Sequence, residues 1–322
     1  MEFLKRFFLI ILRIGISFIL IFFLFKQIDK RIIFENIKNA DKLFLALAFL
    51  LNFFIYFFCF LRWRMLIKAS GIFAPLKRLI AAFCGGIFFN VLLPSAIGGD
   101  IVRVLDLGSF LKKRRTVFAT VLLDRLSGCI GVVIVAWGAF LLGFRFIYHQ
   151  NIFYSISLIT ILLLLILFFL FNSFLFNRII KILDNLPFLI RINNFLKDFY
   201  VQISTFKNYK KIILKSILLS IFIQIIGPIG FYLLAQGLGI KIKIIYFFIF
   251  IPLIGAITLL PISLGGLGIR DVACVFFFSQ VGVSKALAFS ASLISFFFIL
   301  IYAGLGGIIY VFNLYPRRIQ SD

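Results

Sequence analysis

"LLPSAIGGD" at residues 92–100 and "LLPISLGGLG" at residues 259–268 repeat one helix-breaking phrase 167 positions apart. In each copy a glycine pair begins four residues after the proline, and an arginine, Arg103 or Arg270, follows nine residues after it. Proline interrupts a helix because it lacks an amide hydrogen, and glycine permits the turn that follows. The repetition therefore predicts two broken helices built to one plan.

The chain around these phrases is a membrane protein by composition. It is 63% hydrophobic and 14% charged, and its mean hydropathy is +1.17. Such a chain has too few polar groups to cover its apolar surface in water. Windows long enough to cross about 30 Å of hydrocarbon as a helix lie at residues 7–25, 43–61, 117–143, 152–172, 212–235 and 286–312. We therefore expect an all-α polytopic membrane protein with six full spans, the first being retained because no signal-peptide cleavage site follows it.

The net charge of +23 lies mostly in the loops between these windows. Basic clusters at 62–68, which includes Arg62, and at 77–78 and 112–115 fall on one side if the N-terminus is cytoplasmic. The loop 26–42 is an exception, but the overall asymmetry predicts a cell-membrane protein with both termini in the cytoplasm. Basic residues in this pattern report orientation and contact with anionic lipid headgroups, so nucleic acid is not expected as a partner.

The segment 173–211 is too charged to span a membrane and too hydrophobic to be a free loop. Pro187 divides it into two pieces, each of which mixes Ile, Leu and Phe with Lys and Arg. This pattern is typical of interfacial amphipathic helices. We expect a linker on the inner leaflet, and a lipid-sensing role is the alternative.

Each broken phrase joins two helices that are too short to cross the membrane. The stretch 79–93 would be about 22 Å long as a helix, and a second helix follows from near Asp100; the later copy repeats this over 244–260 and 269–282. The flanking spans match at an offset of 169. The chain 1–322 is thus predicted to be one domain with inverted repeats at about 43–143 and 212–312. Re-entrant hairpins in inverted repeats are a usual sign of a transport site.

Arg103 and Arg270 would be costly at membrane depth without partners or function, by about 2.5–3.5 kcal/mol. Asp100, Asp106, Asp124 and Asp271 are candidate partners. One hypothesis is that free helix amides and the arginines bind an anionic, phosphate-bearing headgroup. The alternatives are a structural charge network and glycines that serve only close helix packing. The candidate substrate-binding residues are Asn90, Pro94, Ser95, Gly98, Gly99, Asp100, Arg103, Asp124, Arg125, Pro261, Ser263, Gly265, Gly266, Arg270 and Asp271.

Four stretches resemble the flippase-like transmembrane domain of lysylphosphatidylglycerol synthases (multiple peptide resistance factor) and its stand-alone relatives. They are "LRWRMLI" at 61–67, "NVLLPSAIGGDIVR" at 90–103, "LLDRLSG" at 122–128 and "LPISLGGLGIRD" at 260–271. The family more usually has Glu where this chain has Asp271. The resemblance covers about residues 10–312 and implies translocation of aminoacylated phosphatidylglycerol, other lipids or polyprenyl-linked sugars. The synthases also carry a soluble aminoacyl-transferase domain that these residues lack. A separate lipid-modifying or glycosyl-transferring enzyme is therefore a candidate partner.

A competing hypothesis is an integral membrane glycosyltransferase or other lipid-modifying enzyme that uses a polyprenyl phosphate. Such enzymes need acidic residues in exposed loops, and the outer loops offer only Asp29, Glu35 and Asp41. His149 has no metal-ligand neighbours, and neither a metal nor a cofactor is expected. Cys59, Cys84, Cys129 and Cys274 lie in apolar segments, so we expect no disulfide. The sequence favours a transporter over an enzyme.

Overall fold

The structure is a computed structural model. It describes residues 28–93, 98–143, 209–258 and 264–319, together with scattered positions between 15 and 26 and between 154 and 165. Every regular element within these residues is a helix, as predicted. Some predicted features lie outside the described residues. They are most of the spans 7–25 and 152–172, His149, the linker 173–208, and the hairpin tips at 94–97 and 259–263.

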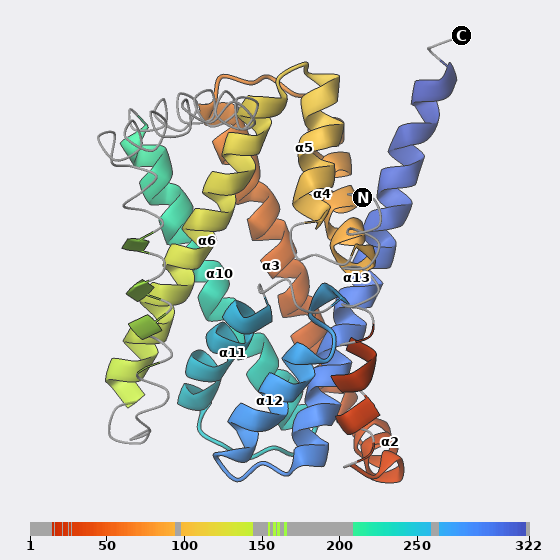
Figure 1. Cartoon of the computed structure of the whole chain (residues 1–322), viewed down its shortest axis with the longest axis vertical. Helices are drawn as coiled ribbons and strands as arrows, with labels where there is room; N and C mark the ends of the chain where they lie inside the picture. The colour runs from red at the N-terminus through yellow and green to blue at the C-terminus, as the bar shows by residue number, and fades with distance from the viewer. Residues whose placement is uncertain are drawn as a thin grey trace, which may run out of the picture.

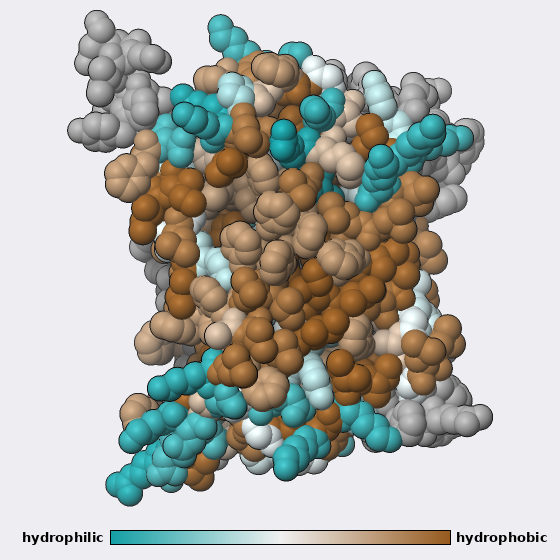
Figure 2. Space-filling view, turned by 180° about the vertical axis from the view of Figure 1, so that it is seen from behind, coloured by the Kyte–Doolittle hydropathy of each residue, from teal (hydrophilic) through white to brown (hydrophobic). Residues whose placement is uncertain are grey.

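Four helices are long and apolar enough to cross a membrane, and they correspond to four of the six predicted spans. They are α3 (Lys42–Ala69), α6 (Arg114–Gly143), α10 (Lys210–Gly237) and α13 (Lys285–Ile319). The predicted span 43–61 stopped before Arg62, whereas α3 continues through that residue, which is buried. Figure 2 shows one face of the molecule, with a hydrophobic band across its middle and hydrophilic side chains gathered at both ends. This is the surface of a polytopic membrane protein.

Four shorter helices form the two predicted hairpins. The first consists of α4 (Leu76–Leu92) and α5 (Gly98–Phe110), and the second of α11 (Ile244–Thr258) and α12 (Ile269–Ser279). A 3-10 turn, η2 (Leu264–Gly266), precedes α12. The helices of each hairpin pack against each other, and the hairpins occupy opposite halves of the molecule (Figure 1). The re-entrant geometry and the division into inverted repeats stay predictions, and this opposite placement is the arrangement that they require.

Each hairpin also packs against a long helix from the other half of the chain. Helix α4 lies on α13, α11 lies on α6, and α3 lies on α10. The approach of α4 to α13 depends on glycine. A Cβ at Gly306 would lie 2.8 Å from the Cys84 carbonyl oxygen, and a Cβ at Gly85 would lie 2.5 Å from the Tyr310 ring. These glycines serve close helix packing, which is a common arrangement in membrane helix bundles.

The segment 26–42, expected to be a loop, contains a helix. This helix, α2 (Lys30–Lys38), begins after Asp29, whose carboxylate accepts a hydrogen bond from the Arg31 amide at 2.8 Å. Asp41 caps α3 in the same way through the Leu43 amide. Side-chain oxygens at these positions satisfy amides that the first turn of a helix leaves unpaired. Two of the three acidic residues in the loops that were predicted to lie outside are therefore helix caps.

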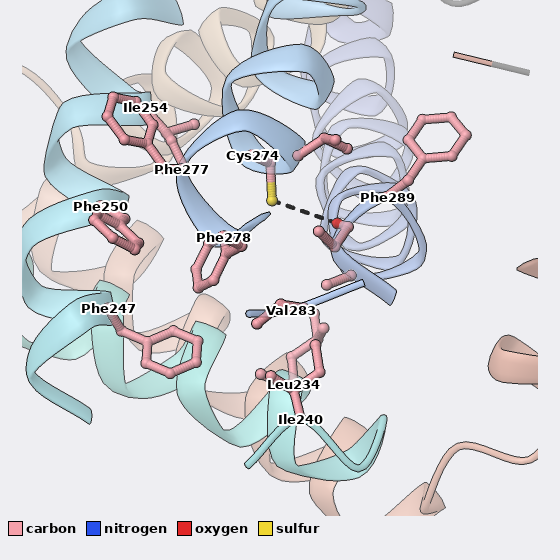
Figure 3. Packing of buried hydrophobic residues seen from close by; sticks show 14 of the residues in the cluster. Leu234, Ile240, Phe247, Phe250, Ile254, Cys274, Phe277, Phe278, Val283 and Phe289 are labelled. Atoms are coloured by element: carbon pink, nitrogen blue, oxygen red, sulfur yellow. Dashed lines mark hydrogen bonds between the residues drawn. The ribbon is translucent and has the colours of Figure 1, made fainter. Parts of the chain in front are cut away.

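The largest apolar core surrounds the second hairpin. Phe250 stacks on Phe277 with ring centroids 5.5 Å apart and meets Phe278 edge to face at 5.4 Å. The Cys274 thiol donates to the Ala288 carbonyl at 3.4 Å, which ties α12 to α13 (Figure 3). All four cysteines are free thiols. The second hairpin is thus held by aromatic and aliphatic packing, whereas the first encloses a network of charges.

Candidate functional site

Five charged side chains form a connected network beside the first hairpin, which we call the arginine cluster. Its members come from α3, α5 and α6 and are Arg62, Asp100, Arg103, Asp124 and Arg125. Arginines and carboxylates alternate along it. The Asp100 carboxylate lies 2.6 Å from Arg125 Nε and 3.2 Å from Arg103 Nη1. The Asp124 carboxylate lies 2.7 Å from Arg62 Nε and 3.6 Å from Arg103 Nη2.

The arginine cluster joins the two halves of the chain. Arg62 Nη1 donates to Ser220 Oγ of α10 at 2.7 Å, and this hydroxyl donates to the Ser216 carbonyl at 2.7 Å. Arg62 and Ser220 lie 158 residues apart in sequence. Arg62 also lies against Gly128 of α6, where a Cβ would be 3.5 Å from Arg62 Nη1. One guanidinium therefore holds α3, α6 and α10 together.

Positive charge exceeds negative charge in the arginine cluster. Three arginines and two aspartates leave one positive charge unbalanced. Arg62, Asp100, Arg103 and Asp124 are each buried, and only Arg125 is partly open, with 39% of its side chain exposed. An unbalanced buried charge is expensive, by several kcal/mol per ion before compensation. This surplus of positive charge favours the binding of an anion.

Arg103 is the least tightly paired member of the arginine cluster. Its guanidinium lies over the Trp63 ring at 4.2 Å and near the Phe83 ring at 5.0 Å, and the residue is 5% exposed. Nε and Nη2 have no hydrogen-bond partner among the described residues. These two nitrogens form one edge of the planar guanidinium, the edge that binds carboxylate or phosphate in a bidentate manner. The rings thus hold the guanidinium plane in position, while one binding edge makes no hydrogen bond and has only the 3.6 Å contact of Nη2 with Asp124.

In the second hairpin, side chains of α12 and α13 fill the same edge of the arginine. Arg270 Nε donates to Ser292 Oγ at 3.3 Å, and Nη2 lies 3.1 Å from Asp271 Oδ1. Asp271 is fully buried, and it also accepts from Ser292 Oγ at 2.5 Å and from the Gly268 amide at 2.9 Å. Arg270 and Asp271 balance each other's charge. The repeated arginine therefore has its Nε and Nη2 edge hydrogen-bonded in the second hairpin and without hydrogen bonds in the first.

The two glycine pairs also differ in conformation. Gly98 and Gly99 have helical backbone in the first turn of α5, and a Cβ at Gly99 would lie 1.9 Å from the Gly86 carbonyl oxygen. Gly265 and Gly266 instead have φ angles of 57° and 81°, in the left-handed region that favours glycine. The first pair permits two helices to touch, and the second permits a turn. Close helix packing therefore explains Gly99.

At both breaks, a backbone amide at the start of the second helix already donates a hydrogen bond to a side chain. The Gly99 amide donates to Asn90 Oδ1 at 2.9 Å, and the Gly268 amide donates to Asp271. Each helix also carries an acidic residue in its first turn, Asp100 in α5 and Asp271 in α12. These carboxylates offset the positive end of the helix dipole. The geometry thus favours a guanidinium over the helix N-termini as the anion-binding group.

The two broken phrases meet in the folded protein. A Cβ at Gly265 would lie 3.5 Å from the Val91 carbonyl oxygen and 3.7 Å from that of Asn90. Helix α4 accordingly contacts η2. The fold thus brings Asn90 and Gly265, two predicted site residues, side by side. Four other candidate residues, Pro94, Ser95, Pro261 and Ser263, lie outside the described residues.

An open cavity of about 600 Å³ lies beside the first hairpin, between α4, α5 and α13. Asp106, one turn after Arg103 on α5, lines this cavity. Leu105 and Phe110 are each about half exposed at its rim. The cavity is lined by Phe89, Val102, Leu105, Asp106, Ser109, Phe110 and Tyr310. Its mostly apolar wall is suited to an acyl chain.

The sequence did not predict the side chains that other helices contribute to these arginine contacts. It placed Arg62 with the basic residues of the cytoplasmic loops, and the structure corrects this by burying Arg62 against Asp124. Trp63, Ser220 and Ser292 were not considered. A signal existed for one of them, because Ser292 follows Asp124 by 168 residues, close to the offset that relates the flanking spans. Arg62 and Trp63 also lie within a stretch that resembles the family.

Comparison with known proteins agrees with these features. Residues 10–307 match the family described as the lysylphosphatidylglycerol synthase TM region. The chain belongs to this family. It is 27% identical over 316 residues to a UPF0104 membrane protein of Pyrococcus horikoshii, a match that covers 90% of this chain and 91% of the relative. It is 26% identical over 281 residues to a UPF0104 membrane protein of Methanothermobacter thermautotrophicus, covering 81% and 82% respectively. No solved structure matches the chain.

Proposed function

We propose that this protein is a flippase-like transporter that moves an anionic, phosphate-bearing lipid between membrane leaflets. The observation that carries the proposal is that Nε and Nη2 of Arg103 make no hydrogen bond with the described residues, within a cluster that has one surplus positive charge. A phosphate would supply both the missing hydrogen-bond acceptors and the missing negative charge. Membership of the synthase TM family supports a lipid as the source of that phosphate.

Each member of the arginine cluster has a distinct role in this proposal. Arg103 binds the phosphate, and the Trp63 ring fixes the plane of its guanidinium. Asp100 and Asp124 orient Arg103, while Arg62 holds Asp124 in place. Arg125, the most exposed of the five residues, attracts the headgroup from the surface. The cavity between α4, α5 and α13 takes part of the apolar chain.

The proposed location is the cell membrane, with both termini in the cytoplasm. The C-terminal end of α3, the turn between α5 and α6 and the start of α10 lie at one end of the molecule (Figure 1). This end carries Lys68, Lys112, Lys113, Lys210 and Lys211. Cytoplasmic loops carry an excess of Lys and Arg in membrane proteins. Arg62 lies about two turns before the end of α3, so a headgroup at the arginine cluster would enter from this side.

We further propose transport in preference to catalysis. Asp29 and Asp41, which an enzyme would need as free acids or bases in the outer loops, are engaged as helix caps. Among the residues that the structure describes, no three His, Cys, Asp or Glu side chains lie close enough together to hold a metal ion. Turnover of a sugar nucleotide by the purified protein in the presence of a polyprenyl phosphate would favour the glycosyltransferase alternative.

The test is leaflet exchange of a fluorescent phosphatidylglycerol in vesicles that contain the purified chain. Arg103→Lys keeps the charge but loses the planar bidentate edge, and we expect it to slow exchange at least tenfold at an unchanged melting temperature. Arg103→Ala should abolish exchange. Lys68→Ala, which removes an exposed charge two turns after Arg62, is the matched control and should exchange lipid at the wild-type rate. Wild-type exchange by folded Arg103→Lys protein would refute the proposed site, and no exchange by the wild type would refute the function.

A further inference from the structure

We infer that α2 (Lys30–Lys38) is an interfacial helix, which lies on the membrane surface and binds the headgroups of anionic lipids there. The inference does not depend on the transport proposed above. It concerns the segment 26–42, whose basic residues are the exception to the charge asymmetry of the loops. It follows from the placement of the apolar and the basic side chains on this helix.

The fold holds α2 at one end of the molecule. The helix has nine residues and is therefore about 14 Å long, too short to cross about 30 Å of hydrocarbon. It lies beside α13, at the end away from the start of α10 (Figure 1). Ile33 packs into the core with 4% exposure, and the Asp41 amide just after the helix donates to the Gly237 carbonyl at 2.9 Å. The faces that α2 presents are therefore set by its packing.

The apolar face of α2 continues from the core to the surface. Beside the buried Ile33, the side chains of Ile32, Phe34 and Ile37 are 47%, 68% and 38% exposed. Together these four residues occupy one broad side of the helix. Leaving so much apolar surface in water is unfavourable, whereas the edge of the hydrocarbon layer would cover it.

The polar face of α2 is positively charged. Arg31, Glu35 and Lys38 follow one another at steps of four and three residues, so they share one side of the helix, and all three are exposed. Glu35 offsets only one of the two positive charges. Long basic side chains can keep their charged ends at the headgroups while the helix body lies deeper. Basic residues on one face and phenylalanine on the other are typical of helices that lie in the membrane interface.

The rest of this end of the molecule adds to the positive charge. The described residues there include eight basic and three acidic side chains, and two of the three acids cap helices. The basic residues are Lys26, Lys30, Arg31, Lys38, Lys42, Lys241, Lys243 and Lys285, and all are exposed. Such a surplus attracts anionic headgroups more strongly than zwitterionic ones. A membrane surface rich in anionic lipid therefore matches both faces of α2 at once.

Tryptophans at two neighbouring positions test which face of α2 touches lipid. The full-length variants Phe34→Trp and Glu35→Trp are placed in vesicles whose lipids carry dibrominated acyl chains, which quench tryptophan fluorescence on contact. The wild type corrects for the native Trp63 and Trp137. We expect the fluorescence that Phe34→Trp adds to be quenched at least twofold more than that which Glu35→Trp adds. Equal quenching in the two variants would overturn the interfacial placement of α2.

Mixed vesicles test the choice of headgroup in the Phe34→Trp protein. At equal mole fraction, brominated phosphatidylglycerol among unlabelled phosphatidylcholine should quench at least twofold more than brominated phosphatidylcholine among unlabelled phosphatidylglycerol. Adding Arg31→Gln/Lys38→Gln should at least halve this preference. Both side chains are exposed, so we expect an unchanged melting temperature. Lys68→Gln/Lys113→Gln, which removes two exposed charges at the opposite end, is the matched control and should keep the preference.

Two results would overturn the binding of anionic lipid by α2. One is equal quenching by the two brominated lipids. The other is a preference that Arg31→Gln/Lys38→Gln leaves unchanged. Fluorescence of Phe34→Trp that neither lipid quenches, together with cross-linking between chains, would instead assign this face to a second copy of the protein and would also overturn the inference.

Discussion

The carbonyl oxygen of Gly86 occupies the space that a side chain at Gly99 would need, only 1.9 Å from the position of its Cβ. The backbones of α4 and α5 touch at this point. A Cβ at Gly86 would in turn meet the Arg103 side chain at 2.6 Å. The closed hairpin and the position of Arg103 therefore depend on the same pair of glycines.

Gly99→Ala should destabilise the protein, because a backbone carbonyl cannot move aside as a flexible side chain can. We expect a loss of about 1–3 kcal/mol, the usual cost of overpacking. Thermal unfolding in detergent measures the effect. Gly138→Ala in α6 is the control, because its added methyl group meets nothing within 4 Å. In Gly138→Ala, the higher helix propensity of alanine should raise the free energy of unfolding by about 0.5–1 kcal/mol. Equal melting temperatures for the two variants would contradict this account of the hairpin.

Arg62→Ala should unfold or strongly destabilise the chain. It leaves the buried Asp124 carboxylate with only the 3.6 Å contact to Arg103, and breaking a buried ion pair costs about 3–5 kcal/mol. Ser220→Ala should cost less, about 1.5–3 kcal/mol, because it removes the hydrogen bond from the charged Arg62 and the bond to the Ser216 carbonyl but leaves the ion pair of Arg62 with Asp124 in place.

A double-mutant cycle checks the pairing of Arg62 with Asp124. The variant Arg62→Ala/Asp124→Ala should be more stable than the sum of the single losses, since no unpaired carboxylate remains. Protein yield and melting temperature, measured for all three variants beside the wild type, provide the comparison. If the losses of stability are additive, the 2.7 Å contact between Arg62 and Asp124 does not stabilise the fold.

Arg270→Ala should affect stability and spare transport. The Asp271 carboxylate keeps its bonds to Ser292 and to the Gly268 amide, so we expect a loss of about 1.5–3 kcal/mol, the range for a hydrogen bond to a charged group. Lipid exchange per folded molecule should equal that of the wild type. A folded Arg270→Ala protein without exchange would instead place a second headgroup site in the second hairpin.

Topology can be checked with single cysteines at exposed positions. A membrane-impermeant maleimide should label Lys113→Cys, which lies between α5 and α6, from the cytoplasm, and Lys285→Cys, at the start of α13, from outside. Lys285 is preferable to the neighbouring Val283, which is buried. The unaltered chain serves as the control for its four native cysteines. If both sites react from the same side, the inverted arrangement of the two halves is wrong.

Local sequence was sufficient to predict the membrane class, four long helices and the four short helices on either side of the two breaks. The length of an apolar run decides whether a helix can cross the membrane, and proline and glycine interrupt a helix through their own backbone chemistry. The beginnings of α4, α5, α11 and α12 accordingly fall within a few residues of the predicted positions. The family was recognised from the same short stretches. The helix α2 was missed because its N-cap, Asp29, lies in a charged segment that was expected to be a loop.

Only the tertiary structure distinguished Arg103 from Arg270. The two arginines occupy the same place in a repeated phrase, and the sequence treats them alike. What separates them is the set of oxygens that other helices bring within hydrogen-bond distance. Ser292 of α13 and Asp271 fill one edge of Arg270, whereas Asp124 stays 3.6 Å from Arg103 because Arg62 of α3 holds its other oxygen at 2.7 Å. Such contacts join residues far apart in the chain, so helix packing decides them and local propensity does not.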